Sequence, residues 1–230
     1  MPTSGIISTL ATVQDFGRMA MQEIGALSAG EMPTAQEGEV IIQRLNWMLK
    51  SWQAEGCNLW RDASSTVVFG IGVSTVTLAP RVIDVIDARA IVSATNERAL
   101  ARWEPADYRR LPNKASAGSP TAFMLTKGIG AVTMTVWPVP TVATTISYAY
   151  ARVIEDVTAL VETIDVPQEW SETVLYGLAA RLANVFGATL TDAASVERVT
   201  AYAAVLERKL LDFDRPASVY MGSATRRRWR

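Results

Sequence analysis

The stretch Ala131-Val-Thr-Met-Thr-Val-Trp137 alternates between two kinds of side chain and decides the character of the middle of the chain. Its two valines and Met134 lie on one face of an extended backbone, and its two threonines and Trp137 lie on the other. One apolar face beside one mixed face is typical of a half-buried antiparallel strand. The stretch therefore predicts β structure between residues 131 and 137.

Five further runs around this strand have the same composition. Each is short, rich in β-branched or aromatic residues, and bounded by Gly, Pro, Ser or Asn. They cover residues 65–69, 73–78, 89–94, 121–126 and 144–150. We therefore expect a β module in the middle of the chain, with a helical turn at residues 104–111.

The periodicity changes to that of helices on both sides of this β region. Four segments have apolar residues at spacings of three and four, which mark one face of a helix. These segments are residues 8–27, 34–56, 168–187 and 193–213. Thr34 and Glu37 form a T-x-x-E capping box at the start of the second segment. Pro167 suits the start of the third, where a missing N–H costs nothing.

Each of these helices is too amphipathic to stand alone, so we expect all four to pack together. Packed helices are usually joined by about 2–8 residues, so the gap of about a hundred residues between the second and third needs a folded insert. We predict an α+β fold: a four-helix bundle with an inserted antiparallel β-sandwich-like module and an extended C-terminal tail. The bundle would comprise residues 1–62 and 164–214, the β module residues 63–163, and the docking tail residues 215–230.

The absence of histidine limits the chemistry available to this chain of 230 residues. A Ser-His-Asp or Cys-His catalytic arrangement is impossible, and so is a zinc site of the Cys/His type. The single cysteine, Cys57, lacks a base partner and cannot form an internal disulfide. Acid–base chemistry would have to fall on carboxylates, Lys or Tyr.

Three pairs of carboxylates remain as candidates for a divalent metal site or a glycosidase-type site. They are Asp84/Asp87, Glu155/Asp156 and Asp212/Asp214. Each pair also fits the solvated end of a strand or helix, which is the commoner meaning of such spacing. Two Gly-Ile-Gly runs, at residues 70–72 and 128–130, fit hairpin turns better than phosphate-binding loops, because neither has a third glycine or opens a helix. We therefore predict no catalytic residue, no metal site and no cofactor.

The formal net charge of −1 is close to neutral but unevenly distributed. Arg226, Arg227, Arg228 and Arg230 surround Trp229 at the C-terminal end, and the rest of the chain is mildly acidic. An acidic body does not suit a protein that grips duplex DNA across one face. No apolar run is long enough to predict a membrane span, and no signal peptide is evident. We expect a soluble protein that is made in a cytoplasm.

Two groups of residues are candidates for contacts with other subunits or proteins. Trp47, Trp52 and Trp60 surround one helix end, where they either belong to the core or face a neighbouring subunit, since Trp is common at interface anchors. The arginine-rich end, residues 226–230, is either a solvated terminus or a docking peptide that becomes ordered on a partner. We favour docking for this end.

Ordered motifs along the chain resemble those of a known family. Leu45-Asn-Trp-Met-Leu-Lys-Ser-Trp-Gln-Ala-Glu-Gly56 is similar to the "LN-x-ML-x-SW-x-AEG" helix of tailed-bacteriophage head-to-tail adaptors. These proteins are also called head-completion, tail accessory, packaged-DNA stabilisation or tail tubular A-like proteins. Similar segments follow in the family's order at residues 75–86, 103–108, 118–123 and 136–140. Val166-Pro-Gln-Glu-Trp170, followed by Tyr176-Gly-Leu-Ala-Ala180, resembles the family's "LP-x-x-W/Y…GLAA" helix.

The resemblance spans about residues 5 to 215 and implies a structural protein of the virion, with no enzymatic activity. It implies a ring, typically of twelve copies, between the portal protein of the phage head and a downstream tail or nozzle protein. Double-stranded DNA would pass through the lumen without sequence-specific binding, and the ring would help to retain the packaged DNA. A near-neutral or acidic lumen suits this role, because basic patches grip phosphate. In such families the C-terminal segment often reaches into the portal.

Two other functions stay open from the residues alone. The arginine-rich end would suit a nucleic-acid-binding protein whose affinity for DNA falls steeply with salt. A carboxylate-based hydrolase would need two or more of the acidic residues named above to converge in one cleft. The adaptor ring subunit is the leading hypothesis.

Overall fold

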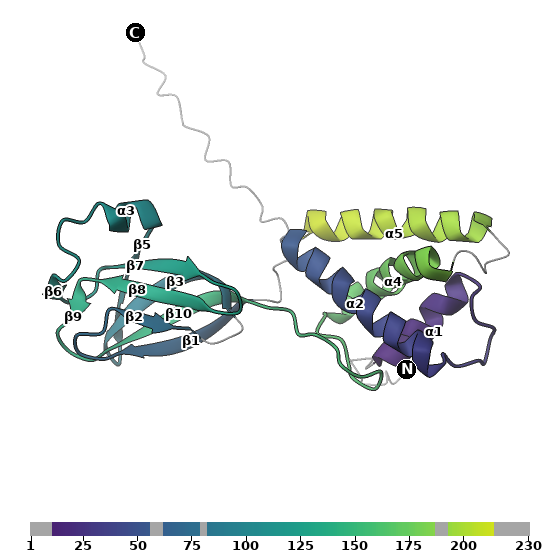
Figure 1. Cartoon of the computed structure of the whole chain (residues 1–230), viewed down its shortest axis with the longest axis horizontal. Helices are drawn as coiled ribbons and strands as arrows, with labels where there is room; N and C mark the ends of the chain where they lie inside the picture. Colours follow the sequence, from purple (N-terminus) through teal and green to yellow (C-terminus); the bar gives the residue numbers. More distant parts are fainter. Residues whose placement is uncertain (1–10, 56–61, 79–81, 187–192, 214–230) are drawn as a thin grey trace, which may run out of the picture.

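The computed structural model describes residues 11–55, 62–78, 82–186 and 193–213. Figure 1 shows the four longer helices gathered at one end of the molecule, and the strands with the short helix α3 (Pro105–Arg109) at the other. The described residues form five α-helices and three small sheets, so the predicted α+β class is confirmed. The chain enters the sheets after its second helix and returns to the helices after its last strand.

The four longer helices match the four predicted helical segments. They are α1 (Val13–Glu23), α2 (Ala35–Glu55), α4 (Ser171–Phe186) and α5 (Ala193–Phe213), with a short 3₁₀ turn, η1 (Gln168–Trp170), before α4. The predicted capping box of α2 is confirmed, since the Thr34 N–H donates to Glu37 Oε2 at 2.7 Å and the Glu37 N–H donates to Thr34 Oγ1 at 3.3 Å. Helix α1 ends earlier than predicted because Gly25 adopts a left-handed φ of 73°, which terminates a helix.

Helix α4 is the centre of the helical core, because it packs against α1, α2 and α5. A Cβ atom at Gly177 would lie only 2.9 Å from Met48 Sδ, so the glycine permits the close approach of α4 to α2. The helices differ in length, with 11 residues in α1 and 21 in α2, so α1 covers only part of its longer neighbour. The four helices share one core, but they do not form a clear four-helix bundle.

Two four-stranded sheets make up most of the β region. In spatial order, the first consists of β1 (Asp62–Phe69), β10 (Thr144–Arg152), β3 (Val82–Ser93) and β4 (Asn96–Ala99). The second consists of β2 (Thr75–Thr77), β8 (Val132–Trp137), β7 (Ala122–Lys127) and β5 (Ala101–Trp103). A third sheet pairs β6 (Ala117–Gly118) with β9 (Val139–Pro140), and α3 (Pro105–Arg109) follows β5 at the predicted helical turn.

The alternating stretch that predicted β structure is strand β8. Val132, Met134 and Val136 are buried, as the alternation predicts. They belong to a core that both four-stranded sheets share, which also contains Phe69, Val85, Phe123 and Ile146. Thr135 on the other face is also buried, because β8 lies between β2 and β7 and the Thr135 hydroxyl lies 3.3 Å from that of Thr75.

Strand β3 is longer than the predicted strand at residues 89–94. Its first half carries Asp84 and Asp87, whose charges hide the apolar pattern of a strand in the sequence. Both aspartates are paired, since Arg102 Nη2 lies 3.0 Å from Asp84 Oδ1 and Arg89 Nε lies 2.8 Å from Asp87 Oδ2. The first half of β3 therefore contains paired charges and lacks the apolar alternation from which strands were predicted.

Candidate functional site

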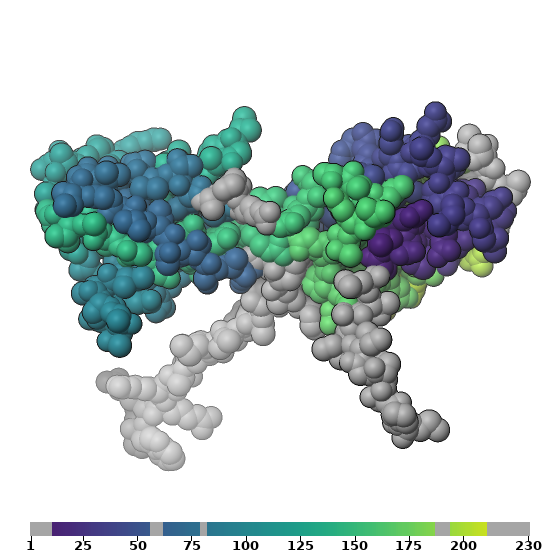
Figure 2. All heavy atoms as spheres, turned by 90° about the horizontal axis from the view of Figure 1, so that it is seen from below, coloured from purple at the N-terminus to yellow at the C-terminus, as the bar shows by residue number. Residues whose placement is uncertain are grey.

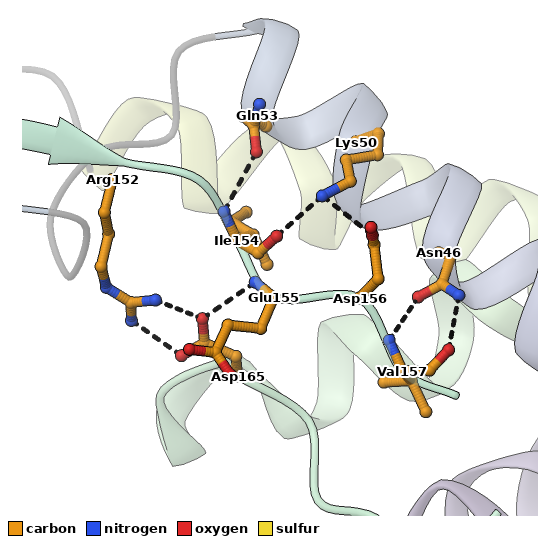
Figure 3. A network of polar contacts seen from close by, with 9 residues as sticks. All are labelled: Asn46, Lys50, Gln53, Arg152, Ile154, Glu155, Asp156, Val157 and Asp165. Carbon is orange, nitrogen blue, oxygen red and sulfur yellow. Dashed lines mark hydrogen bonds and ion pairs between the residues drawn. The ribbon is translucent and has the colours of Figure 1, made fainter. Parts of the chain in front are cut away.

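A network of polar contacts lies where the chain returns from the sheets to the helices (Figure 3). We call residues 153–167 the connecting segment. Ile154 and Val157 in this segment are buried in the helical core, although the predicted β module extends to residue 163. The connecting segment therefore packs as part of the helical region.

One face of α2 binds the connecting segment through three polar side chains (Figure 3). Asn46 Nδ2 donates to the carbonyl of Val157 at 2.8 Å, and the Val157 N–H donates to Asn46 Oδ1 at 2.9 Å. Lys50 Nζ donates to the carbonyl of Ile154 at 2.7 Å and lies 2.8 Å from Asp156 Oδ1. The Ile154 N–H donates to Gln53 Oε1 at 3.1 Å. These side chains give the extended backbone the hydrogen bonds that a neighbouring strand would give it.

An ion pair between Arg152 and Asp165 joins the two ends of the connecting segment. Arg152 Nη2 donates to Asp165 Oδ1 at 2.7 Å, and Nη1 donates to the other carboxylate oxygen. The same carboxylate accepts the N–H of Glu155 at 3.2 Å. The hydrogen bonds to Asp165 raise the pKa of Arg152 above its usual value. This bidentate pair fixes the point where β10 ends and the helical region begins.

A tight loop inside the connecting segment holds the start of α1. The Thr158 N–H donates to Glu162 Oε2 at 2.7 Å, and the Ala159 N–H donates to the same oxygen at 3.1 Å. The carbonyl of Glu162 in turn accepts the Val13 N–H at 2.9 Å, which is one of the unpaired donors at the start of α1. The connecting segment therefore joins α1 to α2 as well as to the sheets.

Acid is expected to loosen this loop. The Thr158 N–H, the Thr158 hydroxyl and the Ala159 N–H all donate to the Glu162 carboxylate and hold its pKa below the usual value. A depressed pKa contributes stability that is present above the unfolded-state pKa and is lost as the pH falls through the folded-state pKa. Amide hydrogen exchange at Thr158 and Ala159 should therefore be slow near neutral pH and faster, after correction for intrinsic rates, below pH about 4.

The variant Glu162→Gln serves as the reference for this pH effect. It cannot ionise, so the difference in protection between neutral and acidic pH should disappear at Thr158 and Ala159. A pH effect of the same size in the variant would show that another group is responsible.

The connecting segment borders an open hollow of about 750 Å³, lined by Arg152 and by residues between Glu155 and Asp165. Carboxylates of this segment are engaged by the protein itself, Asp156 by Lys50, Asp165 by Arg152 and Glu162 by backbone N–H groups. In the described part of the chain, no group of three or more His, Cys, Asp or Glu side chains could hold a metal ion. These contacts hold the connecting segment against α2 and against the end of β10.

The structure separates the carboxylate pairs that the sequence singled out. Asp84 and Asp87 lie on β3 with different cationic partners, and Glu155 and Asp156 lie in the connecting segment. The structure describes neither the side chain of Asp212 nor any part of Asp214. Of the described candidates, Glu155 and Asp156 both line the open hollow beside the connecting segment, and Asp156 is paired there with Lys50.

The three tryptophans proposed for an interface have different environments. Trp52 is 2% exposed, and its ring meets that of Trp170 edge-on at a centroid distance of 5.7 Å. Trp47 is 55% exposed, with Arg44 Cζ 5.0 Å from its ring centroid. Trp60 and the arginine-rich end, residues 226–230, lie outside the described residues. Of these candidates, Trp47 is the one with a described, solvent-facing ring.

Sequence reasoning missed the polar face of α2. Asn46, Lys50 and Gln53 are spaced by four and three residues, so they share one face of the helix. The same spacing is typical of a solvated helix face, and nothing local distinguishes a polar stripe that faces water from one that faces backbone. This polar face could have been predicted only by asking which side chains hydrogen-bond to the backbone N–H and C=O groups of the segment before Pro167.

No known protein family matches this chain, and no curated protein is significantly similar to it. In the described ranges, no helix is long and apolar enough to cross a membrane.

Proposed function

We propose that this chain is a structural subunit of an adaptor ring that joins the portal of a tailed-phage head to the tail. The ring extends the DNA channel and helps to retain packaged DNA, without enzymatic activity or a cofactor. Its partners are other copies of the chain, the portal protein and a downstream tail or nozzle protein. The family resemblance implies twelve copies in the ring. Double-stranded DNA passes through the lumen without sequence-specific contacts.

The observation that carries the proposal is the meeting of distant motif residues in one core. Trp52 belongs to the first motif of the resemblance and Trp170 to the last, and their rings are in contact. Met48 of the first motif lies against Gly177 of the last, where a Cβ would approach within 2.9 Å. Residues from the first and the last motif of the resemblance therefore lie in contact in one core.

The architecture supports the same proposal. We interpret the four helices as the adaptor's bundle and the two sheets as its β-sandwich-like insertion, with residues 215–230 as the docking tail. The Arg152–Asp165 ion pair joins the end of β10 to the connecting segment, which suits a subunit that has to keep its two regions together. Trp47 offers the exposed aromatic ring that an interface anchor needs.

The proposal is tested by mixing the purified chain with the portal of the same phage and separating the mixture by size-exclusion chromatography. The free chain should elute as a monomer or weak oligomer and should co-elute with the portal as a ring. A portal that recruits no copy of the chain at any salt concentration would contradict the adaptor function.

Removal of residues 226–230 is expected to weaken portal binding at least tenfold, or about 1.4 kcal/mol. The four arginines and Trp229 supply charge-assisted hydrogen bonds and an aromatic anchor, and they lie beyond the last described helix. The measurement is a binding titration of truncated and full chains against the portal, with circular dichroism as the control for folding. Equal affinity of the two chains would remove this end from the docking mechanism.

The nucleic-acid-binding alternative makes a different prediction for the same truncation. It requires affinity for free DNA that falls steeply with salt and is lost with Arg226, Arg227 and Arg228. Filter binding of both chains to duplex DNA at several salt concentrations separates the two functions.

A further inference from the structure

Strand β1 has one free edge. It pairs over its whole length, Asp62 to Phe69, with β10, and β10 lies on one side only. On its other side, no described residue forms a backbone hydrogen bond with it. Every second N–H and C=O of an edge strand points outward without a partner. The strand therefore offers an eight-residue template for another strand.

This edge lacks the features that protect edge strands from further pairing. Residues 63–69 contain no charge and no proline, and the register with β10 shows no bulge. Val68 is 61% exposed. The opposite edge, β4, is half as long, carries Glu97 and Arg98, and follows a register irregularity in β3. Because natural sheets usually guard an edge with such charges and bulges, the unguarded β1 edge indicates a strand-binding site.

Exposed aliphatic side chains continue this surface beyond the end of β1. Ile71 is 71% exposed in the turn after β1, and Val142 is 64% exposed before β10. The Gly72 N–H donates to the carbonyl of Pro140 at 2.9 Å, which holds the two loops together. In the view from below (Figure 2), the blue surface that includes β1 covers much of the near face of the β module.

The chain itself contains a segment that suits this edge. Residues 217–225 are uncharged and follow Pro216, and they include the run Ser218-Val-Tyr-Met221. Val and Tyr favour strands, and a neutral segment matches a neutral edge without burying a charge. Arg226 and the residues after it lie beyond this segment and would stay available to another partner.

The position of α5 allows the segment to reach the sheets. The C-terminal end of α5 lies on the side of the helical region that faces the β module (Figure 1). Residues 214–216 separate α5 from the segment, and a fully extended stretch of that length spans about 10 Å. The segment would therefore start close to the end of α5, on the side that faces the sheets of the same copy.

We propose that the outer edge of β1 binds residues 217–222 of this chain as an added strand. The backbone of the segment supplies the hydrogen bonds, and Val219 or Tyr220 covers the aliphatic surface around Val68. The proposal does not depend on the adaptor function, because it concerns a contact of the chain with itself.

The test is residue-resolved amide hydrogen exchange in the full chain, measured by NMR at residues 63–69. Alternate amides of β1 point to β10 and the others point outward. With the segment bound, both sets should exchange slowly. In the variant Val219→Pro, which removes one N–H and restricts the backbone of the added strand, the outward set should exchange at least tenfold faster while the β10-facing set stays unchanged.

The matched control is Ala224→Pro, which lies in the same region of the chain but outside the proposed strand and should leave both sets slow. Outward amides that exchange rapidly in the unsubstituted chain would overturn the proposal. Protection that survives Val219→Pro would also overturn it and would point to β1 of a second copy as the occupant. Portal binding is measured separately, so failure of the adaptor function leaves this exchange pattern unaffected.

Discussion

Replacement of Trp52 by alanine is expected to lower the free energy of unfolding by about 4 kcal/mol. Trp52 is 2% exposed, and its ring packs edge-on against Trp170. Its Nε1–H donates to Glu207 Oε1 at 3.2 Å, so the tryptophan joins α2 to α5 as well as to the start of α4. The variant leaves a cavity at this junction and removes one of the hydrogen bonds of the Glu207 carboxylate. Urea denaturation followed by circular dichroism measures the loss.

The matched control lies five residues earlier on the same helix. Trp47→Ala removes an exposed ring that contacts Arg44, so the free energy of unfolding should change by no more than about 0.5 kcal/mol. The same control variant should weaken assembly if Trp47 faces a neighbouring subunit. Equal losses of stability in the two variants would contradict the assignment of Trp52 to the core.

Replacement of Asn46 by alanine is expected to cost about 3 kcal/mol of unfolding free energy. The variant leaves both the N–H and the carbonyl of Val157 without their partner, and Val157 is only 4% exposed. Each unsatisfied buried polar group costs about 1–3 kcal/mol, and entry of water relieves part of this cost. Denaturation measures the total, and hydrogen exchange at the Val157 amide shows whether the loss is local.

Gln43→Ala, an exposed position one turn earlier on α2, is the control for helix propensity and should be nearly neutral. If Asn46→Ala were as mild as this control, the connecting segment would be held by its apolar residues and not by the polar face of α2. The variant Asn46→Asp separates the two hydrogen bonds, because it keeps an acceptor for the Val157 N–H and loses the donor to its carbonyl.

The features that were predicted correctly depend on neighbouring residues. The capping box of Thr34 and Glu37 requires side chains three residues apart, and the strand at 132–137 shows its period within seven residues. The end of α1 was predicted wrongly at residue 27, although the position of Gly25 in the sequence could have indicated the earlier end. Local rules of this kind apply before any tertiary contact is known.

The features that were missed depend on residues far apart in the chain. The contacts of Asn46 with Val157 span 111 residues, so no local pattern contains them. The sequence could not decide which tryptophan is buried in the core and which faces a neighbouring subunit. Trp47 and Trp52 lie on different faces of α2, and either face could have been the buried one. The position of Trp170 decided between them.

The pairing of β1 with β10 has a consequence for the order of folding. Gln53 and Ile154 are hydrogen-bonded although 101 residues separate them, and closing a loop of that length is slow and entropically costly. Once Asp62 lies opposite Ala151, only a short stretch of chain on each side separates Gln53 from Ile154. This shortening removes about 2 kcal/mol of closure entropy. We therefore expect the sheets to form first. Their formation would bring α4 and α5 close to α1 and α2, so that the inserted β module acts as a folding template for the helical core.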